Sequence, residues 1–178
     1  GMDTITSDFK LYGGRVGTYG GPGRNLGIQN CDLLLGLGTR VSGRITGGNP
    51  PSFAREAKKY VVDIDSALLK KKYQPVKFDE NIYSDLNVFL DIFLKEVKKN
   101  HIGKNNFVAW NKKVKFWREK YNTYNKKYSK PEGHIHKGKK YVHPYALINS
   151  LSNQLSNKDI IVGDCGGISV MIGHCLKT

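Results

Sequence analysis

The sequence predicts an α/β fold: a Rossmann-like parallel sheet with flanking helices, followed by an incomplete second α/β segment. Two nearly continuous apolar runs, residues 31–39 and 60–65, have the composition of strands that are buried on both faces of a parallel sheet. A glycine- and proline-rich loop at residues 43–51 and a predicted short helix at residues 52–59 separate the two runs. The order strand, loop and helix, strand indicates a βαβ unit.

The segment ahead of the first strand is rich in glycine. Residues 13–27 contain seven glycines and one proline, so we expect a shaped loop that leads into a short helix. Because glycine has no side chain, the backbone of such a loop can approach a ligand closely.

The segment after the second strand predicts one more strand and a helix. We expect a turn or short helix at residues 66–71 and a third, shorter strand at residues 76–78. Residues 85–99 place apolar side chains at helical spacing, which predicts an amphipathic helix. Those side chains are Leu86, Phe89, Leu90, Phe93, Leu94 and Val97.

The last part of the chain alternates helix and linker signals. We expect a helix at residues 105–125, a linker at residues 126–140, and a helix at residues 143–156 with proline in its first turn. A buried strand at residues 159–166 and a helix at residues 168–176 would follow.

Three segments follow from this reading. Residues 10–100 form an α/β unit, residues 101–141 a lysine-rich helical linker, and residues 142–178 the truncated beginning of a second α/β domain.

Positive charge is concentrated in the predicted linker. The chain has 29 Lys and Arg against 15 Asp and Glu, a net charge of +14, and residues 104–140 hold twelve of the basic residues against two acidic ones. Aromatic residues lie between these lysines, a composition that suits a surface for single-stranded nucleic acid. Arg118 is the one arginine in the segment, and a helix with one apolar stripe and one solvated lysine face explains the same pattern. We therefore expect a helical connector, and a polyanion-binding protein stays the alternative.

Composition also bears on the compartment. No apolar run has the length of a membrane-spanning helix, and the three cysteines lie far apart without a CxxC pair. We expect a cytoplasmic protein with no membrane partner and reduced cysteines.

The ends of the two predicted strands form a candidate ligand site. In an open α/β sheet, ligands bind at the carboxyl ends of the strands, where Gly38 and Arg40 follow the first strand and Asp63 lies in the second. Arg40 and Arg44 would pair with a diphosphate, and Asp63 with ribose hydroxyls. No GxGxxG motif is present, and the alternative is that both arginines lie on a surface loop.

Other candidate chemistry is sparse. His134 and His136 form an HxH motif without a third ligand at a suitable spacing, so we expect a solvated loop and no metal site. Cys165 and His174 would suit a thiolate and its base, but a strand-end cysteine among glycines is explained by its small size. We assign no catalytic residue.

At this level of detail a family resemblance becomes visible. The run from Thr18 to Gly48, followed by the strand YVVDID, resembles the middle domain of thiamine-diphosphate-dependent enzymes of the acetolactate synthase type. The end of the chain, IIVGDCGG, is similar to the start of the family's diphosphate-binding domain. The matched positions are Gly17, Gly20, Asn25, Asp32, Gly38, Arg40, Arg44, Thr46 and Gly47, with Asp63-Ile64-Asp65 after them.

The resemblance implies cofactors and site residues. Thiamine diphosphate and Mg²⁺ belong to the parent enzyme, and the middle domain of the family often holds FAD. Tyr19, Gly20 and Gly21 would line the flavin loop, and Arg40 would meet the diphosphate or the ribityl chain. The remaining cofactor-binding positions are Gly38, Arg44, Asp63, Ile64, Cys165, Gly166 and Gly167.

The sequence departs from the family pattern in two places. Residues 40–44 read RVSGR where the synthases have two acidic residues in RFDDR, which leaves FAD binding open. Residues 165–167 read Cys-Gly-Gly in place of Val-Gly-Gln, so the substrate is not restricted to pyruvate.

Together these features predict a fragment of a carboligase or decarboxylase that acts on a small 2-oxo acid. The glutamate-bearing N-terminal domain and the GDG…N metal motif of the family are absent from the sequence, so we expect the chain alone to be inactive. Its partners would be the rest of the parent enzyme and further copies in a homo-oligomer, with no nucleic acid. A stand-alone nucleotide-binding module is the alternative.

Overall fold

The computed structural model describes residues 4–102, 107–130, 133–156 and 158–177. The chain divides into two compact units, each described by itself below: unit 2 is Leu26–Lys113, and unit 1 combines Gly1–Asn25 with Val114–Thr178. The division into residues 10–100, 101–141 and 142–178 that the sequence suggests stays a prediction.

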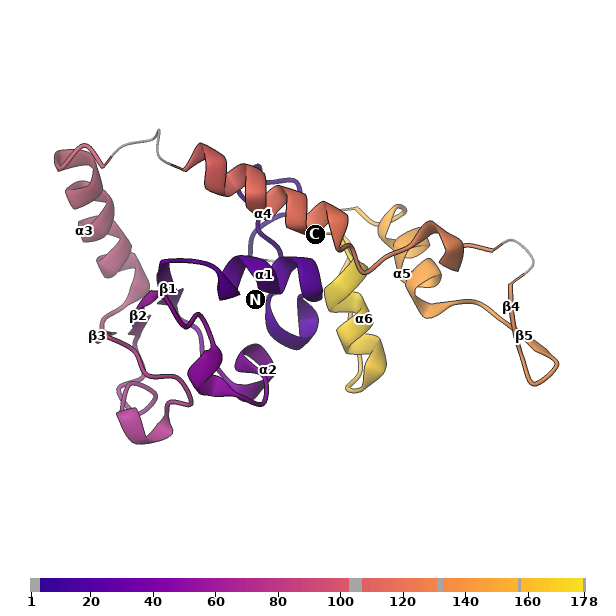
Figure 1. The fold of residues 1–178 in the computed structure, drawn as a ribbon, viewed down its shortest axis with the longest axis horizontal. Coiled ribbons are helices and arrows are strands. Elements are labelled where there is room, and N and C mark those ends of the chain that lie inside the picture. Colours follow the sequence, from indigo (N-terminus) through magenta and orange to yellow (C-terminus); the bar gives the residue numbers. More distant parts are fainter. Residues whose placement is uncertain (1–3, 103–106, 131–132, 157, 178) are drawn as a thin grey trace. The chain divides into compact units, whose positions relative to one another are not determined.

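Unit 2 is built on a parallel sheet. Strands β1 (Leu33–Leu37), β2 (Lys58–Asp63) and β3 (Glu80–Tyr83) lie side by side in the order β1-β2-β3 (Figure 1). Each neighbouring pair is parallel, with Leu35 opposite Tyr60 and Val61 opposite Asn81. The α/β fold class and the first two strands are therefore confirmed.

The third strand begins later than predicted. Residues 76–78 are not a strand, since pairing with β2 begins only at Glu80. Val76 and Phe78 are nevertheless buried, at 3% and 5% exposed. Contact with β2 starts one residue after Phe78, where the backbone N–H of Asp79 donates to the Lys59 carbonyl at 2.8 Å. The alternation of apolar side chains with Lys77 comes from a loop that packs into the core.

The connection between β1 and β2 also differs from its prediction. Helix α1 (Pro22–Gln29) precedes β1 as expected, but α2 (Gly43–Thr46) lies where a glycine–proline loop was predicted. The helix predicted at residues 52–59 is wrong, since the 3₁₀ turn η2 (Pro50–Ser52) and a further turn occupy this stretch. Ala54, inside this stretch, has a φ of 45°, which lies outside the right-handed helical region.

A cluster of buried hydrophobic residues in unit 2 contacts strand β2 through Val61. Phe53, Ala54 and Ala57 come from the connection, and Val61, Val76 and Phe78 from the strands and loops around it. Partly buried side chains pack against this cluster: Ile28, Cys31, Leu34, Val41, Ile45 and Leu69.

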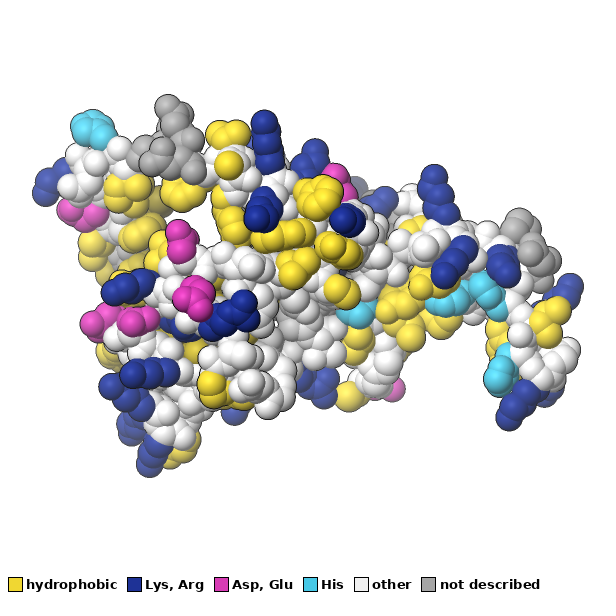
Figure 2. Space-filling view, in the orientation of Figure 1, with side chains coloured by type: hydrophobic (Ala, Val, Ile, Leu, Met, Phe, Trp, Pro, Cys, Tyr) yellow, Lys and Arg dark blue, Asp and Glu magenta, His cyan; other side chains and the backbone are white. Residues whose placement is uncertain are grey.

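Helix α3 (Leu86–Lys99) confirms the predicted amphipathic helix. The Asp85 carboxylate caps its N-terminus, accepting hydrogen bonds from the N–H groups of Asn87 at 2.8 Å and Val88 at 3.4 Å. None of its side chains is buried, and Figure 2 shows hydrophobic side chains exposed along it. Val88 and Ile92, for example, are 55% and 58% exposed.

Unit 1 contains helical elements joined by turns. Unit 1 contains the short 3₁₀ segments η1 (Gly17–Tyr19) and η4 (Lys126–Tyr128). The 3₁₀ segment η3 (Lys71–Tyr73) belongs to unit 2. Helix α4 (Val108–Lys120), of which residues 114–120 belong to unit 1, confirms most of the helix predicted at residues 105–125. The first two residues of that prediction lie outside the described part of the chain.

A hairpin replaces part of the predicted linker. Strands β4 (His134–His136) and β5 (Lys139–Tyr141) pair antiparallel. Lys137 and Gly138 form a two-residue turn with positive φ angles of 49° and 74°, the geometry of a tight hairpin. Lysine is an unusual residue for the first of these positions, so the sequence carried no hairpin signal.

The end of the chain has both predicted helices but not the predicted strand. Helices α5 (Pro144–Ser152) and α6 (Gly167–Cys175) pack against each other. Residues 159–166 form no strand, and Ile160 and Val162 are 87% and 90% exposed. A strand forms only when a neighbour satisfies its backbone, and none pairs with this run within the described residues. No helix in the described residues combines the length and the apolar character needed to cross a membrane.

Candidate functional site

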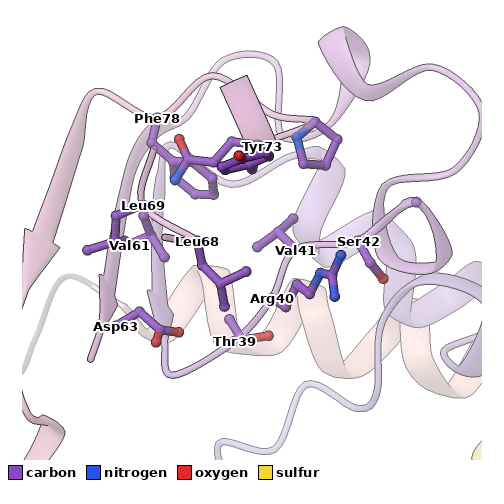
Figure 3. Close-up of a pocket in the computed structure, with 13 residues that line it drawn as sticks. Thr39, Arg40, Val41, Ser42, Val61, Asp63, Leu68, Leu69, Tyr73 and Phe78 are labelled. Carbon is purple, nitrogen blue, oxygen red and sulfur yellow. The ribbon is translucent and has the colours of Figure 1, made fainter. Parts of the chain in front are cut away.

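Unit 2 has a pocket at the carboxyl ends of β1 and β2, with a volume of about 260 Å³ (Figure 3). One side comes from the segment after β1, and the other from the segment that follows β2. The lining consists of Thr39, Arg40, Val41, Ser42, Gly43, Val61, Asp63, Leu68, Leu69, Tyr73, Gln74, Pro75 and Phe78.

Two oppositely charged residues predicted from the sequence line this pocket together. Asp63 is the last residue of β2 and is 8% exposed, and Arg40 lies three residues beyond β1 on an exposed loop. One oxygen of the Asp63 carboxylate accepts a hydrogen bond from the Asp65 N–H at 2.9 Å, which fixes the side chain. Because β1 and β2 are parallel neighbours, their ends meet at one edge, as the strand order required.

The lining has a polar and an aromatic side. Figure 3 shows Arg40, Thr39 and Asp63 on one side and the rings of Tyr73 and Phe78 on the other. Guanidinium and hydroxyl groups suit phosphate oxygens, a carboxylate suits ribose hydroxyls, and aromatic rings suit a planar base. The described lining contains no cysteine, histidine or lysine.

Sequence reasoning missed the wall that follows β2. Leu68, Leu69, Tyr73, Gln74 and Phe78 come from a segment that was expected only to turn and to form a short strand. The available signal was the rule that loops after parallel strands surround the ligand, applied to β2 as well as to β1.

Three other predicted residues of unit 2 lie outside the lining. Gly38 directly precedes it and has a φ of 54°, a conformation that favours glycine. Arg44 lies in α2 and is exposed, and Ile64 is 64% exposed. Of the predicted positions in unit 2, the structure brings together Arg40 and Asp63.

Other residues of unit 1 fill the space beside the predicted flavin-loop glycines Gly20 and Gly21. A side chain at Gly20 would overlap the Arg15 carbonyl, and Gly21, with a φ of 70°, would place a Cβ 2.9 Å from Thr123. Asn25 fixes the loop ahead of them, since its amide accepts from the Gly17 N–H at 2.7 Å and donates to the Gly17 carbonyl at 3.0 Å. These glycines are needed for packing within unit 1. Tyr19 ends η1 and is half-buried.

The predicted cofactor residues near α6 lie on exposed backbone. Cys165, Gly166 and Gly167 are all exposed. Gly166 has a φ of 122° at the start of the helix, and a Cβ there would meet nothing within 4 Å. The Ser169 hydroxyl donates to the Gly166 carbonyl at 2.8 Å.

His174 has a structural role in unit 1. Its two ring nitrogens lie 2.8 Å from the Tyr145 hydroxyl and 2.8 Å from the Thr18 carbonyl. Burial lowers the pKa of His174 and raises the pKa of Tyr145. Burial also raises the pKa of Cys175 to about 11, so this thiol stays protonated at neutral pH. Both ring nitrogens of His174 are therefore engaged within unit 1.

Metal ligands do not gather in the described residues. No group of three or more His, Cys, Asp or Glu side chains there could hold an ion. The cysteines are free. His134, half of the HxH motif, lies with Nε2 3.0 Å from the Tyr128 carbonyl.

Comparison with known proteins identifies the family. The family model described as thiamine pyrophosphate enzyme, central domain, matches residues 1–93, which is more than half of the chain. The chain belongs to this family. Thiamine pyrophosphate is the same cofactor as thiamine diphosphate, and the three-stranded parallel sheet of unit 2 lies within the matched residues.

Acetolactate synthases are among the relatives of this chain. The chain is 31% identical to the acetolactate synthase large subunit of Cyanidium caldarium over 94% of its own length and 26% of that protein. It is 33% identical to the isozyme 2 large subunit of Escherichia coli over 51% of the chain and 16% of that protein. For the probable large subunit of Methanocaldococcus jannaschii the identity is 37%, over 52% and 15%. The chain therefore spans about a quarter or less of the length of these relatives.

Proposed function

We propose that the chain is part of a thiamine-diphosphate-dependent carboligase or decarboxylase of the acetolactate synthase type, acting on a small 2-oxo acid. Within it, the unit 2 pocket binds the nucleotide end of a cofactor. The observation that carries the pocket assignment is the convergence of Arg40 and Asp63 at the ends of two parallel strands. Family membership and the acetolactate synthase relatives support the proposal for the parent enzyme.

The shape and charge of the pocket suit a nucleoside diphosphate. Ligand pockets for drug-sized molecules have volumes of roughly 300–1,000 Å³, and the volume of this pocket, about 260 Å³, lies just below that range. The pocket therefore suits the adenosine diphosphate part of a flavin dinucleotide better than the whole molecule. Arg40 would hold a phosphate and Asp63 a ribose hydroxyl, with the base against Tyr73 and Phe78.

Thiamine diphosphate supplies a carbanion at its thiazolium ring, the reactive species for joining or cleaving 2-oxo acids. The part of this chain that we assign to its neighbourhood is Cys165-Gly166-Gly167, where exposed backbone with an open space at Gly166 leaves room for a diphosphate. The same proposal makes the rest of the parent enzyme and further copies of the chain the partners of this protein. We assign no set of Mg²⁺ ligands, because the described residues contain no group of three or more His, Cys, Asp or Glu side chains that could hold an ion.

Titration of the purified chain with ADP and FAD tests the pocket. We expect binding of ADP, and a loss of about tenfold or more in affinity for Arg40→Ala, since the charge-assisted hydrogen bonds to phosphate would be removed. Arg55→Ala is the control, because Arg55 is exposed in the same unit and does not line the pocket. Equal binding by both variants would contradict the assignment. Affinity that falls steeply with salt and is shared with heparin would instead favour the polyanion-binding alternative.

The enzymatic proposal needs a separate test on the full-length protein. We expect consumption of a 2-oxo acid that depends on added thiamine diphosphate and Mg²⁺. Activity that does not change when both are removed by dialysis would contradict it.

A further inference from the structure

Two side-chain amides form a hydrogen-bonded pair behind the aromatic side of the unit 2 pocket. Gln74 lines the pocket and is half-buried. Asn81 lies in β3 opposite Val61, which also lines the pocket. The side chains of Asn81 and Val61 therefore lie on the same face of the sheet. The Gln74 Nε2 donates to Asn81 Oδ1 at 3.0 Å, and Asn81 Nδ2 donates to Gln74 Oε1 at 3.3 Å.

A third hydrogen bond determines which way round both amides lie. Asn81 Nδ2 also donates to the Leu69 carbonyl at 3.0 Å. A carbonyl oxygen can only accept a hydrogen bond, so the Asn81 atom that faces it must be the nitrogen. The oxygen of Asn81 must therefore face Gln74, which in turn requires the nitrogen of Gln74 at that position. The pair also ties two points of the pocket wall, residues 69 and 74, to the sheet.

The pair leaves hydrogen-bonding capacity on Gln74. Its Nε2 carries two hydrogens, and Asn81 accepts one of them. Both hydrogens of Asn81 Nδ2 are used, on Gln74 and on Leu69. Among the described residues, the second N–H of Gln74 has no protein partner. A half-buried donor of fixed orientation in a pocket wall needs an acceptor from water or from a ligand.

We propose that Gln74 donates a hydrogen bond to a ring nitrogen of the base bound in this pocket, and that Asn81 is the positioning residue that aims it. This inference rests on the proposed nucleotide pocket. Tyr73 and Phe78 lie on the side of the lining away from Arg40, so a ligand with its phosphate at Arg40 places its base next to them (Figure 3). Gln74 directly follows Tyr73, and it contributes a polar contact to this otherwise aromatic side.

The experiment compares ADP with three analogues that each lack one ring nitrogen: 1-deaza-, 3-deaza- and 7-deaza-ADP. On the wild-type chain we expect one of the three to bind about fivefold more weakly than ADP, as for one neutral hydrogen bond. On Gln74→Leu we expect that analogue and ADP to bind equally. Gln154→Leu is the control, because Gln154 is an exposed glutamine of unit 1.

Asn81→Leu separates a positioning role from a purely structural one. A positioning role predicts that this variant loses the distinction between ADP and the sensitive analogue. A structural role would weaken ADP and all three analogues by the same factor. Each single variant leaves the remaining amide without its partner and can unfold for that reason. In that case the double variant Gln74→Leu/Asn81→Leu is used, because it replaces both amides with apolar side chains.

The outcomes distinguish this inference from the function on which it rests. If ADP does not bind, or binds equally well to Arg40→Ala, the nucleotide pocket is wrong and the role of Gln74 falls with it. If ADP binds through Arg40 but the wild-type chain binds all three analogues as tightly as ADP, the pocket stands and Gln74 is not a base contact. If an analogue is weakened to the same extent in wild type and Gln74→Leu, another residue reads that nitrogen and the proposal is overturned.

Discussion

Different kinds of contact stabilise the interior of each unit. Unit 2 contains seven of the eight buried hydrophobic residues in the described structure, and Ile148 is the one in unit 1. Unit 1 depends more on polar contacts to backbone carbonyls. Arg15 donates to the carbonyls of Gly173 and Leu176 at 2.9 Å, and Arg24 donates to Gly173 at 3.2 Å. The comparison shows that one chain can combine a packed sheet with a unit organised by directional bonds.

Two apolar runs make this difference concrete. Residues 31–39 and residues 159–166 both have the composition of a strand, but only the first run has a neighbour, β2, and contains a strand, β1. Apolar composition therefore indicates where a strand can form, whereas a partner strand decides whether it does.

Hydrogen exchange should show the largest contrast. We expect backbone amides in β1 to exchange about a thousandfold more slowly than those of residues 160–162, since core strands open only with energies near the global stability. Mass spectrometry of exchanged peptides measures this ratio. Equal protection of the two runs would show that residues 160–162 are paired in solution.

Removing a core ring should destabilise unit 2 alone. Phe78 is 5% exposed, so Phe78→Ala is expected to cost about 3–5 kcal/mol through lost burial and a cavity. Tyr83→Ala is the control, because Tyr83 is 67% exposed in the adjacent strand β3. Urea unfolding followed by exchange of unit-specific peptides gives both values. A similar loss in unit 1 would mean that the units unfold together.

The polar contacts of unit 1 should be weaker individually. His174→Phe keeps a ring but removes the bonds to Tyr145 and Thr18, at an expected cost of about 1–2 kcal/mol. Tyr145→Phe removes only one of these bonds and should cost about half as much. Unfolding of the two variants and of the double variant is the measurement. Additive costs would show that the Tyr145–His174 bond contributes nothing.

A backbone test at the edge of the pocket comes next in size. Gly38 has a φ of 54°, and a Cβ there would lie 2.8 Å from a Leu86 methyl. We expect Gly38→Ala to cost about 1–2 kcal/mol from the left-handed conformation. Gly43→Ala is the matched control, because a Cβ at Gly43 meets nothing within 4 Å. Thermal unfolding measures both, and a neutral Gly38→Ala would show that this loop relaxes.

The smallest expected difference between the units is in their response to acid, which should destabilise unit 1 before unit 2. His143 caps α5, its Nδ1 accepting from the Tyr145 N–H at 3.2 Å, and it stacks on Tyr128 with ring centroids 4.0 Å apart. Burial and the nearby His134 lower the pKa of His143 from 6.5. The unfolded chain therefore binds the proton more tightly, so this contribution to stability is complete above pH 6.5 and is lost as pH falls through the lower folded pKa. His174, with a pKa lowered by burial, acts in the same direction.

Unit 2 should respond only in stronger acid. The Lys59 N–H lowers the pKa of Asp79 from 3.8, so that contribution is lost only below pH 3.8. Between pH 6.5 and about 4.5, the protection factors of unit 1 peptides, which are corrected for the intrinsic exchange rate at each pH, should decrease while those of unit 2 peptides stay constant. His143→Asn keeps an N-cap acceptor and should reduce the pH dependence. A pH response unchanged in that variant would assign the effect to another group.

Local patterns were enough for much of this fold. The apolar runs placed β1 and β2, and the period of apolar side chains together with Asp85 placed α3. Proline and histidine before residues 145–152 placed the start of α5. The same reasoning misplaced β3, because Val76 and Phe78 alternate like a strand while they pack as a loop.

The sequence by itself determined the family, the parallel order of the first two strands, and therefore that Arg40 and Asp63 would lie at one edge of a sheet. These features depend on residue identity and on short-range periodicity, which are written along the chain. Only the tertiary structure decided that the segment after β2 completes the pocket and that Asn81 orients Gln74. Those outcomes depend on how the loop after β2 folds back onto strand β3, a geometry that no local sequence pattern contains.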